Sequence, residues 1–261
     1  MSTVAAGQVH PLYLHGDSRV HRLAPEAKTV AAVLFTVAVV ATPREAFWAF
    51  GGYALLLAAV AAAARVPFGW LAKRSLIEVP FVALAVLLPF LASDDRFTVL
   101  GMELSRDGLY GGWNILAKGT LGVLASLLLA ATTTMRDLIV GLDRLHCPQV
   151  LTQIAAFMLR YLDVLSGEAR RMRVARLSRG DDPRFLWQLR GFATGVGALF
   201  LRAFERGERV YLAMLSRGYG GRMPAALHAD GAATAGQWAA ASVVPAVATA
   251  LSIVAIVGGT A

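Results

Sequence analysis

A short phrase with an arginine between a serine and a glycine occurs twice in this chain. It reads Ala-x-Leu-Ser-Arg-Gly at 175–180 and again at 213–218. An arginine presents a planar fork of donors that fits carboxylates and carbonyl oxygens, and a small residue lets another surface approach closely. Two equal phrases therefore predict two equivalent docking points, which suit a partner present in two copies. The residues concerned are Ala175, Ser178, Arg179 and Gly180 in the first phrase and Ala213, Ser216, Arg217 and Gly218 in the second.

The same phrase also has a purely structural interpretation. Glycine is common directly after the last turn of a helix, and arginine in that turn stabilises the negative end of the helix dipole. Two similar helix ends would explain the glycine and part of the preference for arginine. They would not explain why alanine, leucine and serine recur at the same offsets, so the residues alone leave both interpretations open.

The composition indicates the environment in which these helices fold. The chain has 261 residues, of which 57% are hydrophobic and 16% are charged, and its mean hydropathy is +0.58. Soluble domains usually carry about 25% charged residues, so a membrane protein is expected. The net charge of +8 fits basic loops on one side of a membrane, and we expect no nucleic-acid partner. The one cysteine excludes an internal disulfide, and the polar stretch before the first apolar run predicts no cleavable signal peptide.

Five segments have the roughly 20 mostly apolar residues that a membrane-spanning helix needs. They are 24–42, 46–64, 75–93, 112–134 and 234–257. A sixth crossing would have to use 148–159 or 191–201, and neither uncharged run is long enough. The sequence therefore predicts an all-α polytopic membrane protein with about five spans.

The distribution of charge predicts the orientation of these spans. Basic residues dominate the tail before the first span and the loop between the second and third, whereas the loop between the third and fourth carries a net −2. Because basic loops stay in the cytoplasm, the N-terminus is predicted to be cytoplasmic and the C-terminus to lie outside. Between 136 and 222 there are 15 Arg and 8 acids, so this segment is also placed in the cytoplasm.

The predicted organisation has three parts. Residues 1–134 form the N-terminal tail with four spans, 135–230 form a helical cytoplasmic domain between the last two spans, and 231–261 form the last span. Within the cytoplasmic domain, apolar residues recur at helical spacing from Ile154 to Leu165 and from Phe185 to Ala203. Asp181, Asp182 and Pro183 are typical of the start of the second helix. Both helices are too amphipathic to be expected to span, and the two repeated phrases stand at their ends.

In this position the phrases resemble a motif pair of the T component, or transmembrane coupling protein, of energy-coupling factor transporters, a class of ABC importers. That family carries Ala-Arg-Gly-like motifs at the ends of two cytoplasmic coupling helices, each of which docks in a groove on one of two ATPase subunits. The triplets 178–180 and 216–218 match with Ser in the first place. The leader is similar to the family's Leu-Asp-Pro-Arg-x-Lys pattern at Leu23, Pro25 and Lys28, and it departs at Ala24 and Glu26.

The length and the stretch from 108 to 134 are most similar to the CbiQ branch, which serves cobalt importers. The resemblance implies a coupling subunit in a bacterial inner membrane, whose partners are two CbiO-like ATPases, a CbiM-like substrate-binding membrane subunit and membrane lipid. Cobalt is the substrate that it implies first, with nickel or biotin as alternatives.

The residues also indicate what the chain does not do by itself. No Gly-x-x-x-x-Gly-Lys-[Ser/Thr] motif is present, so we expect no ATP hydrolysis and no enzyme activity. The five His do not pair on one apolar helix face, so no metal site and no cofactor are expected. Glu78 and Lys118 fall inside predicted spans, where they are interpreted as pairing locally or reaching the interface. A membrane enzyme and a self-sufficient secondary transporter are the rival interpretations, and neither the acid–base pair of the first nor the inverted repeats of the second stand out.

Overall fold

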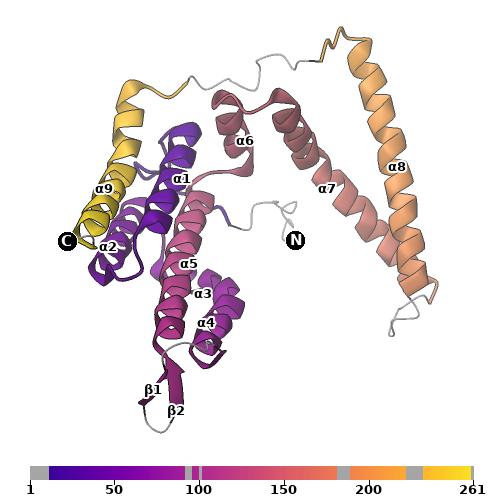
Figure 1. Cartoon of the computed structure of the whole chain (residues 1–261). Helices are drawn as coiled ribbons and strands as arrows, with labels where there is room; N and C mark the ends of the chain where they lie inside the picture. The colour runs from indigo at the N-terminus through magenta and orange to yellow at the C-terminus, as the bar shows by residue number, and fades with distance from the viewer. Residues whose placement is uncertain (1–11, 92–95, 100–101, 181–188, 222–231, 260–261) are drawn as a thin grey trace, which may run out of the picture. The chain divides into compact units, whose positions relative to one another are not determined.

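The computed structural model describes residues 12–91, 96–99, 102–180, 189–221 and 232–259. Its chain forms two compact units (Figure 1). We call residues 10–145 with 231–261 the membrane unit, and residues 146–230 the helix-pair unit. Each is described by itself.

Four long helices form the main body of the membrane unit. They are α1 (Pro25–Ala41), α2 (Phe47–Ala64), α5 (Arg106–Thr132) and α9 (Ala235–Gly259). Helix α1 packs against α5 and α9, and α2 packs against the same two helices. The hydroxyl of Tyr53, which is fully buried among them, contacts Thr42 Oγ1 at 2.7 Å and donates to the carbonyl oxygen of Ala248 at 3.3 Å. Tyr53 thus joins α2 to the end of α1 and to α9.

A shorter, interrupted segment packs along α5. It consists of α3 (Phe68–Ser75), a 3-10 turn η1 (Leu76–Glu78) and α4 (Val79–Leu91). An antiparallel hairpin of β1 (Arg96–Val99) and β2 (Met102–Ser105) then leads into α5. Helices α4 and α5 approach closely at glycines: a Cβ atom on Gly112 would lie 2.5 Å from the carbonyl oxygen of Ala85.

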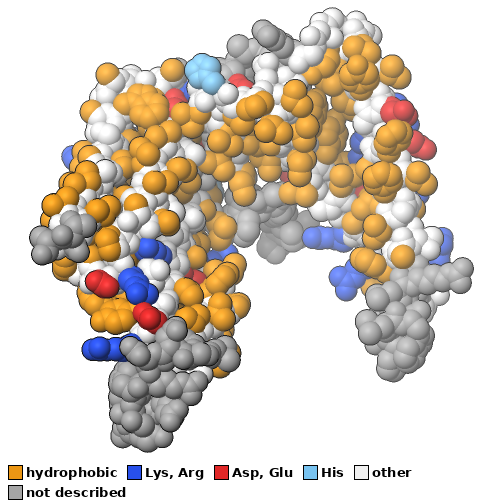
Figure 2. All heavy atoms as spheres, viewed as in Figure 1, with side chains coloured by type: hydrophobic (Ala, Val, Ile, Leu, Met, Phe, Trp, Pro, Cys, Tyr) orange, Lys and Arg blue, Asp and Glu red, His pale blue; other side chains and the backbone are white. Residues whose placement is uncertain are grey.

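The fold confirms the expected class. Among the described residues, four helices are long and apolar enough to cross a membrane, namely α2, α5, α7 (Gln149–Ser178) and α9. The first and third predicted spans correspond to α1, with 17 residues, and to α4, with 13. Apolar side chains are exposed on the outer faces of these helices, and Figure 2 shows many of them on the visible side of α9. Such surfaces suit lipid, so the protein is an all-α membrane protein with a short hairpin added.

Two features of the structure differ from the sequence-based description. Helix α7 meets the length and composition of a span, although Arg160 and Asp163 interrupt its apolar run. Helix α6 (Met135–Arg144) packs on α1 and belongs to the membrane unit, whereas the charge pattern groups it with 135–230. Gly141 allows α6 to pack on α1, because a Cβ atom at this position would lie 2.9 Å from the backbone nitrogen of Glu26.

The helix-pair unit consists of α7 and α8 (Leu189–Leu215). The contacts show that the two helices run antiparallel. The start of α7 at Gln153 meets Tyr219, its middle at Glu168 meets Arg202 and Arg206, and its end at Arg176 meets Phe192. The predicted start of α8 at 181–183 lies outside the described residues.

Candidate docking site

The first phrase ends α7 in the way that its glycine predicts. Arg179 is the C-cap residue, and its backbone N–H donates to the carbonyl oxygen of Arg176 at 3.0 Å. Gly180 follows with a φ of +77°, which favours glycine because other residues rarely adopt it, and its N–H donates to Leu177 at 3.0 Å. The hydroxyl of Ser178 donates to the carbonyl oxygen of Val174 one turn earlier. Arginine and glycine therefore stand on an ordered helix end.

The second phrase repeats this geometry at the end of α8. Gly218 has a φ of +81°, and its N–H donates to the carbonyl oxygen of Leu215 at 3.0 Å. The N–H of Tyr219 donates to Met214 at 3.0 Å, which completes a Schellman motif, a hydrogen-bonded helix end built around a left-handed glycine. The hydroxyl of Ser216, just after α8, donates to the carbonyl oxygen of Ala213 in the last turn. The two phrases thus form two similar structures as well as two similar sequences.

All eight residues of the predicted docking site are exposed: Ala175, Ser178, Arg179, Gly180, Ala213, Ser216, Arg217 and Gly218. Within the part of the chain that the structure describes, neither Arg179 nor Arg217 forms an ion pair. Two guanidinium groups are therefore presented to solvent at equivalent places on two helix ends.

The structure brings together the residues within each phrase but keeps the two phrases apart. Because the helices are antiparallel, Ser216 lies opposite the start of α7, whereas Ser178 is at its other end. The roughly 23 residues of helix between these levels correspond to about 35 Å along the axis, at 1.5 Å a residue. The arrangement therefore offers two separate contact points at opposite ends of one helix pair.

Different neighbours support the two ends, and the sequence spacing does not reveal them. The guanidinium of Arg176, beside the first phrase, lies 5.7 Å from the ring centre of Phe192. Beside the second phrase, the hydroxyl of Tyr219 donates to Gln153 Oε1 at 2.8 Å, and Gln153 Nε2 donates to the carbonyl oxygen of Gly221 at 3.5 Å. These partners are far apart in sequence, so only the antiparallel pairing identifies them.

The two charged residues inside the predicted spans, Lys118 and Glu78, each lie against a neighbouring helix. Lys118 Nζ donates to the carbonyl oxygen of Val40 at 2.8 Å, which ties α5 to the end of α1. Glu78 is buried beside Gly119 of α5, and Arg74, its predicted partner, lies over the ring of Trp70. Among the described residues there is no group of three or more His, Cys, Asp or Glu side chains that could hold a metal ion.

Comparison with known proteins gives the family. Residues 16–226 match the family model CbiQ, described as cobalt transport protein. The chain belongs to the CbiQ family. This match includes both repeated phrases, and it confirms the resemblance to T components of energy-coupling factor transporters.

Relatives of this CbiQ-family chain agree with that assignment. The energy-coupling factor transporter transmembrane protein EcfT of Bacillus selenitireducens is 29% identical over 235 residues, which are 80% of this chain and 82% of the relative. EcfT of Bacillus subtilis is 27% identical over 223 residues, covering 80% of this chain and 83% of the relative. A putative fused cobalt transport protein CbiMQ of Methanocorpusculum labreanum is 29% identical over 109 residues, covering 42% of this chain and 18% of the relative. The chain is a transmembrane component of a transporter, similar to relatives named as energy-coupling factor transporter transmembrane proteins.

Proposed function

We propose that this chain couples the movement of two ATPase subunits to a separate substrate-binding membrane subunit. The observation that carries the proposal is the pair of exposed, equivalent helix ends that present Arg179 and Arg217 about 35 Å apart along α7 and α8. Two equivalent ends suit two copies of one partner, and an arginine fork suits the carboxylates and carbonyl oxygens of a groove. In the proposed complex each ATPase binds one phrase.

The proposed mechanism follows from this geometry. ATP binding draws the two ATPases together, and each moves the helix end that it holds. Because α7 and α8 are joined at their middles through Glu168, Arg202 and Arg206, opposite displacements of their ends turn the helices about that junction. The apolar side chains exposed on both helices, such as Met158 and Phe200, then present a changed surface to the substrate-binding subunit. Such coupling requires contacts that differ between the two states.

Cobalt ion is the substrate that we propose, with nickel ion or biotin as the alternative. The description of the matching family supports cobalt, as does the fused relative CbiMQ, of which this chain matches only 18%. The remaining length of that relative leaves room for a second membrane component. We further propose that the helix-pair unit lies in the cytoplasm of a bacterial cell and that the spans cross its inner membrane, because the excess of arginine in 136–222 follows the positive-inside rule.

Reconstitution tests the proposed function. The chain, its ATPases and a CbiM-like subunit are placed in lipid vesicles, and ATP-dependent uptake of radioactive Co²⁺ is compared with that of Ni²⁺ and biotin. We expect Co²⁺ uptake only when ATP and all components are present. Uptake by the chain alone, without ATPase, would instead support the secondary-transporter interpretation, and uptake of Ni²⁺ or biotin in preference to Co²⁺ would change the proposed substrate.

A further inference from the structure

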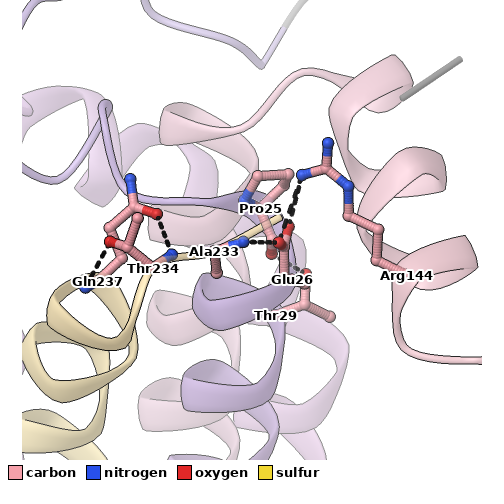
Figure 3. A network of polar contacts seen from close by, with 7 residues as sticks. All are labelled: Pro25, Glu26, Thr29, Arg144, Ala233, Thr234 and Gln237. Carbon is pink, nitrogen blue, oxygen red and sulfur yellow. Dashed lines mark hydrogen bonds and ion pairs between the residues drawn. The ribbon is translucent and has the colours of Figure 1, made fainter. Parts of the chain in front are cut away.

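A buried carboxylate stands at the start of α1, where three segments of the membrane unit meet. The Glu26 side chain is 3% exposed, and the Arg144 side chain beside it is 10% exposed. Arg144 Nη1 donates to both carboxylate oxygens of Glu26 at 3.3 Å. The backbone N–H of Ala233 donates to Glu26 Oε1 at 2.8 Å (Figure 3). One side chain therefore joins α1, the last turn of α6 and Ala233, which lies two residues before α9 begins.

The two partners of Glu26 have a particular place in the chain. Arg144 lies two residues before the helix-pair unit begins at 146, and Ala233 lies three residues after that unit ends at 230. These are the two points at which the chain leaves the membrane unit and returns to it. Both partners lie in ordered structure, so Glu26 binds a fixed residue at the start of one connection and at the end of the other.

Local structure fixes the end of each connection that belongs to the membrane unit. On the first, Gly141 packs directly on the backbone of Pro25 and Glu26, which brings the last turn of α6 against α1. On the second, the N–H of Thr234 donates to Gln237 Oε1 at 3.1 Å and the N–H of Gln237 donates to Thr234 Oγ1 at 3.4 Å. This reciprocal pair is a capping box, which fixes the direction in which the chain enters α9.

We propose that Glu26 is a clasp that holds together both connections between the membrane unit and the helix-pair unit. A force that reaches the membrane unit through either connection is then shared by α1, α6 and α9. A buried carboxylate suits this role because its bonds to a guanidinium and to a backbone N–H are stronger than those between neutral groups, and because losing one partner leaves a buried charge. Glu26 is a positioning residue, and its effect on transport rests on the proposed coupling function.

The clasp itself is tested by hydrogen–deuterium exchange of the full-length chain in lipid nanodiscs, in segments 140–147 and 230–237. Glu26→Ala removes both bonds, so exchange should become about tenfold faster in both segments, as expected when a hydrogen bond to a charged group is lost. Glu26→Gln keeps an acceptor for Ala233, so only 140–147 should change. The exchanged pair Glu26→Arg with Arg144→Glu restores the ion pair but cannot accept from Ala233, so it should protect 140–147 and leave 230–237 fast.

The matched control is Asp107→Asn, which removes an acid from an exposed pair with Arg44 in the same unit and should leave both segments unchanged. Two results would overturn the clasp. One is unchanged hydrogen exchange near Ala233 in Glu26→Ala, and the other is slow hydrogen exchange in both segments of the double variant Glu26→Arg with Arg144→Glu. If Glu26→Ala fails to fold, Glu26→Gln and the double variant Glu26→Arg with Arg144→Glu still decide between a clasp and a simple ion pair.

The consequence for transport is tested in vesicles that contain the whole complex, by measuring Co²⁺ taken up per ATP hydrolysed. A clasp predicts that Glu26→Gln lowers this ratio several-fold while ATP hydrolysis stays within about twofold of wild type. A parallel fall in uptake and hydrolysis would contradict the coupling role and indicate a purely structural one. Absence of ATP-dependent uptake in the wild type would overturn the proposed function, whereas the exchange experiment would still decide on the clasp.

Discussion

The backbone at Gly180 and Gly218 allows a test at the scale of single residues. Both have φ near +80° and open space where a Cβ atom would stand, so an added methyl group meets no neighbour and any cost comes from the backbone alone. We expect Gly180→Ala and Gly218→Ala each to lower the free energy of unfolding by about 1 kcal/mol, since non-glycine residues pay roughly that to adopt a left-handed conformation.

Thermal unfolding followed by circular dichroism measures this effect. Gly207→Ala in the interior of α8 is the control, because it also has open space but no positive φ, and it should be neutral or stabilising by about 0.5–1 kcal/mol. An equal change in the free energy of unfolding in all three variants would contradict the left-handed glycines at the two helix ends.

At this scale the sequence predicts helix ends well and contacts between distant residues poorly. The glycine of each phrase indicates its conformation because few other residues adopt it. By contrast, Glu26 and Glu168 resemble any other acid in the sequence, although both are held by arginines that lie more than 30 residues away in the chain. Nothing in local spacing identifies such partners.

Between elements, the contact of α7 with α8 through Glu168 can be tested. The largely buried Glu168 pairs with Arg202 at 3.1 Å and with Arg206 at 3.4 Å. We expect Glu168→Gln to loosen the helix pair by about 1 kcal/mol, a modest value because both arginines are partly exposed and screened by solvent. Hydrogen exchange in 198–210 should become several-fold faster. Glu205→Gln, which changes an exposed acid on α8, serves as control, and an equal effect of the two changes would refute the junction.

Close packing of α4 on α5 gives a second test at this scale. A methyl group on Gly112 would stand 2.5 Å from a backbone oxygen of Ala85, so the two helices would have to separate. We expect Gly112→Ala to destabilise the protein by about 1–3 kcal/mol, the usual cost of overpacking. Gly122→Ala on the same helix meets no atom and should not destabilise. Melting of both variants in detergent distinguishes them, and a stable Gly112→Ala protein would show that this contact is not tight.

Apolar runs predict which helices exist, but the apolar run of α5 does not show where this helix begins. The fourth predicted span starts at 112, but α5 begins at Arg106 because Ser105 Oγ accepts from the N–H of Gly108. Likewise, the 3-10 turn at 76–78 and the hairpin before α5 carry no periodic signal. The packing of α6 on α1 depends on one glycine, Gly141, so a charge count could not assign it to the membrane unit.

The orientation of the chain in the membrane is a prediction for the whole molecule. Cys147, the one cysteine of the chain, lies at the start of the helix-pair unit and is partly exposed. A membrane-impermeant maleimide should label it in inside-out vesicles and not in intact cells, because the arginine-rich segment is expected in the cytoplasm. Glu45→Cys in a Cys147→Ser background places a thiol in the loop after α1 and should give the reverse pattern. Labelling of Cys147 in intact cells would contradict the proposed topology.

For the whole molecule, we propose that the two phrases bind two ATPase copies. The most direct test of this proposal is co-purification of the ATPase with tagged wild-type chain and with Arg179→Ala, Arg217→Ala and the double variant, with Arg209→Ala on exposed α8 surface as control. We expect full retention of the ATPase by wild type and control, about half or less with each single change, and loss with the double change. Equal retention of the ATPase by all five proteins would contradict docking through these arginines.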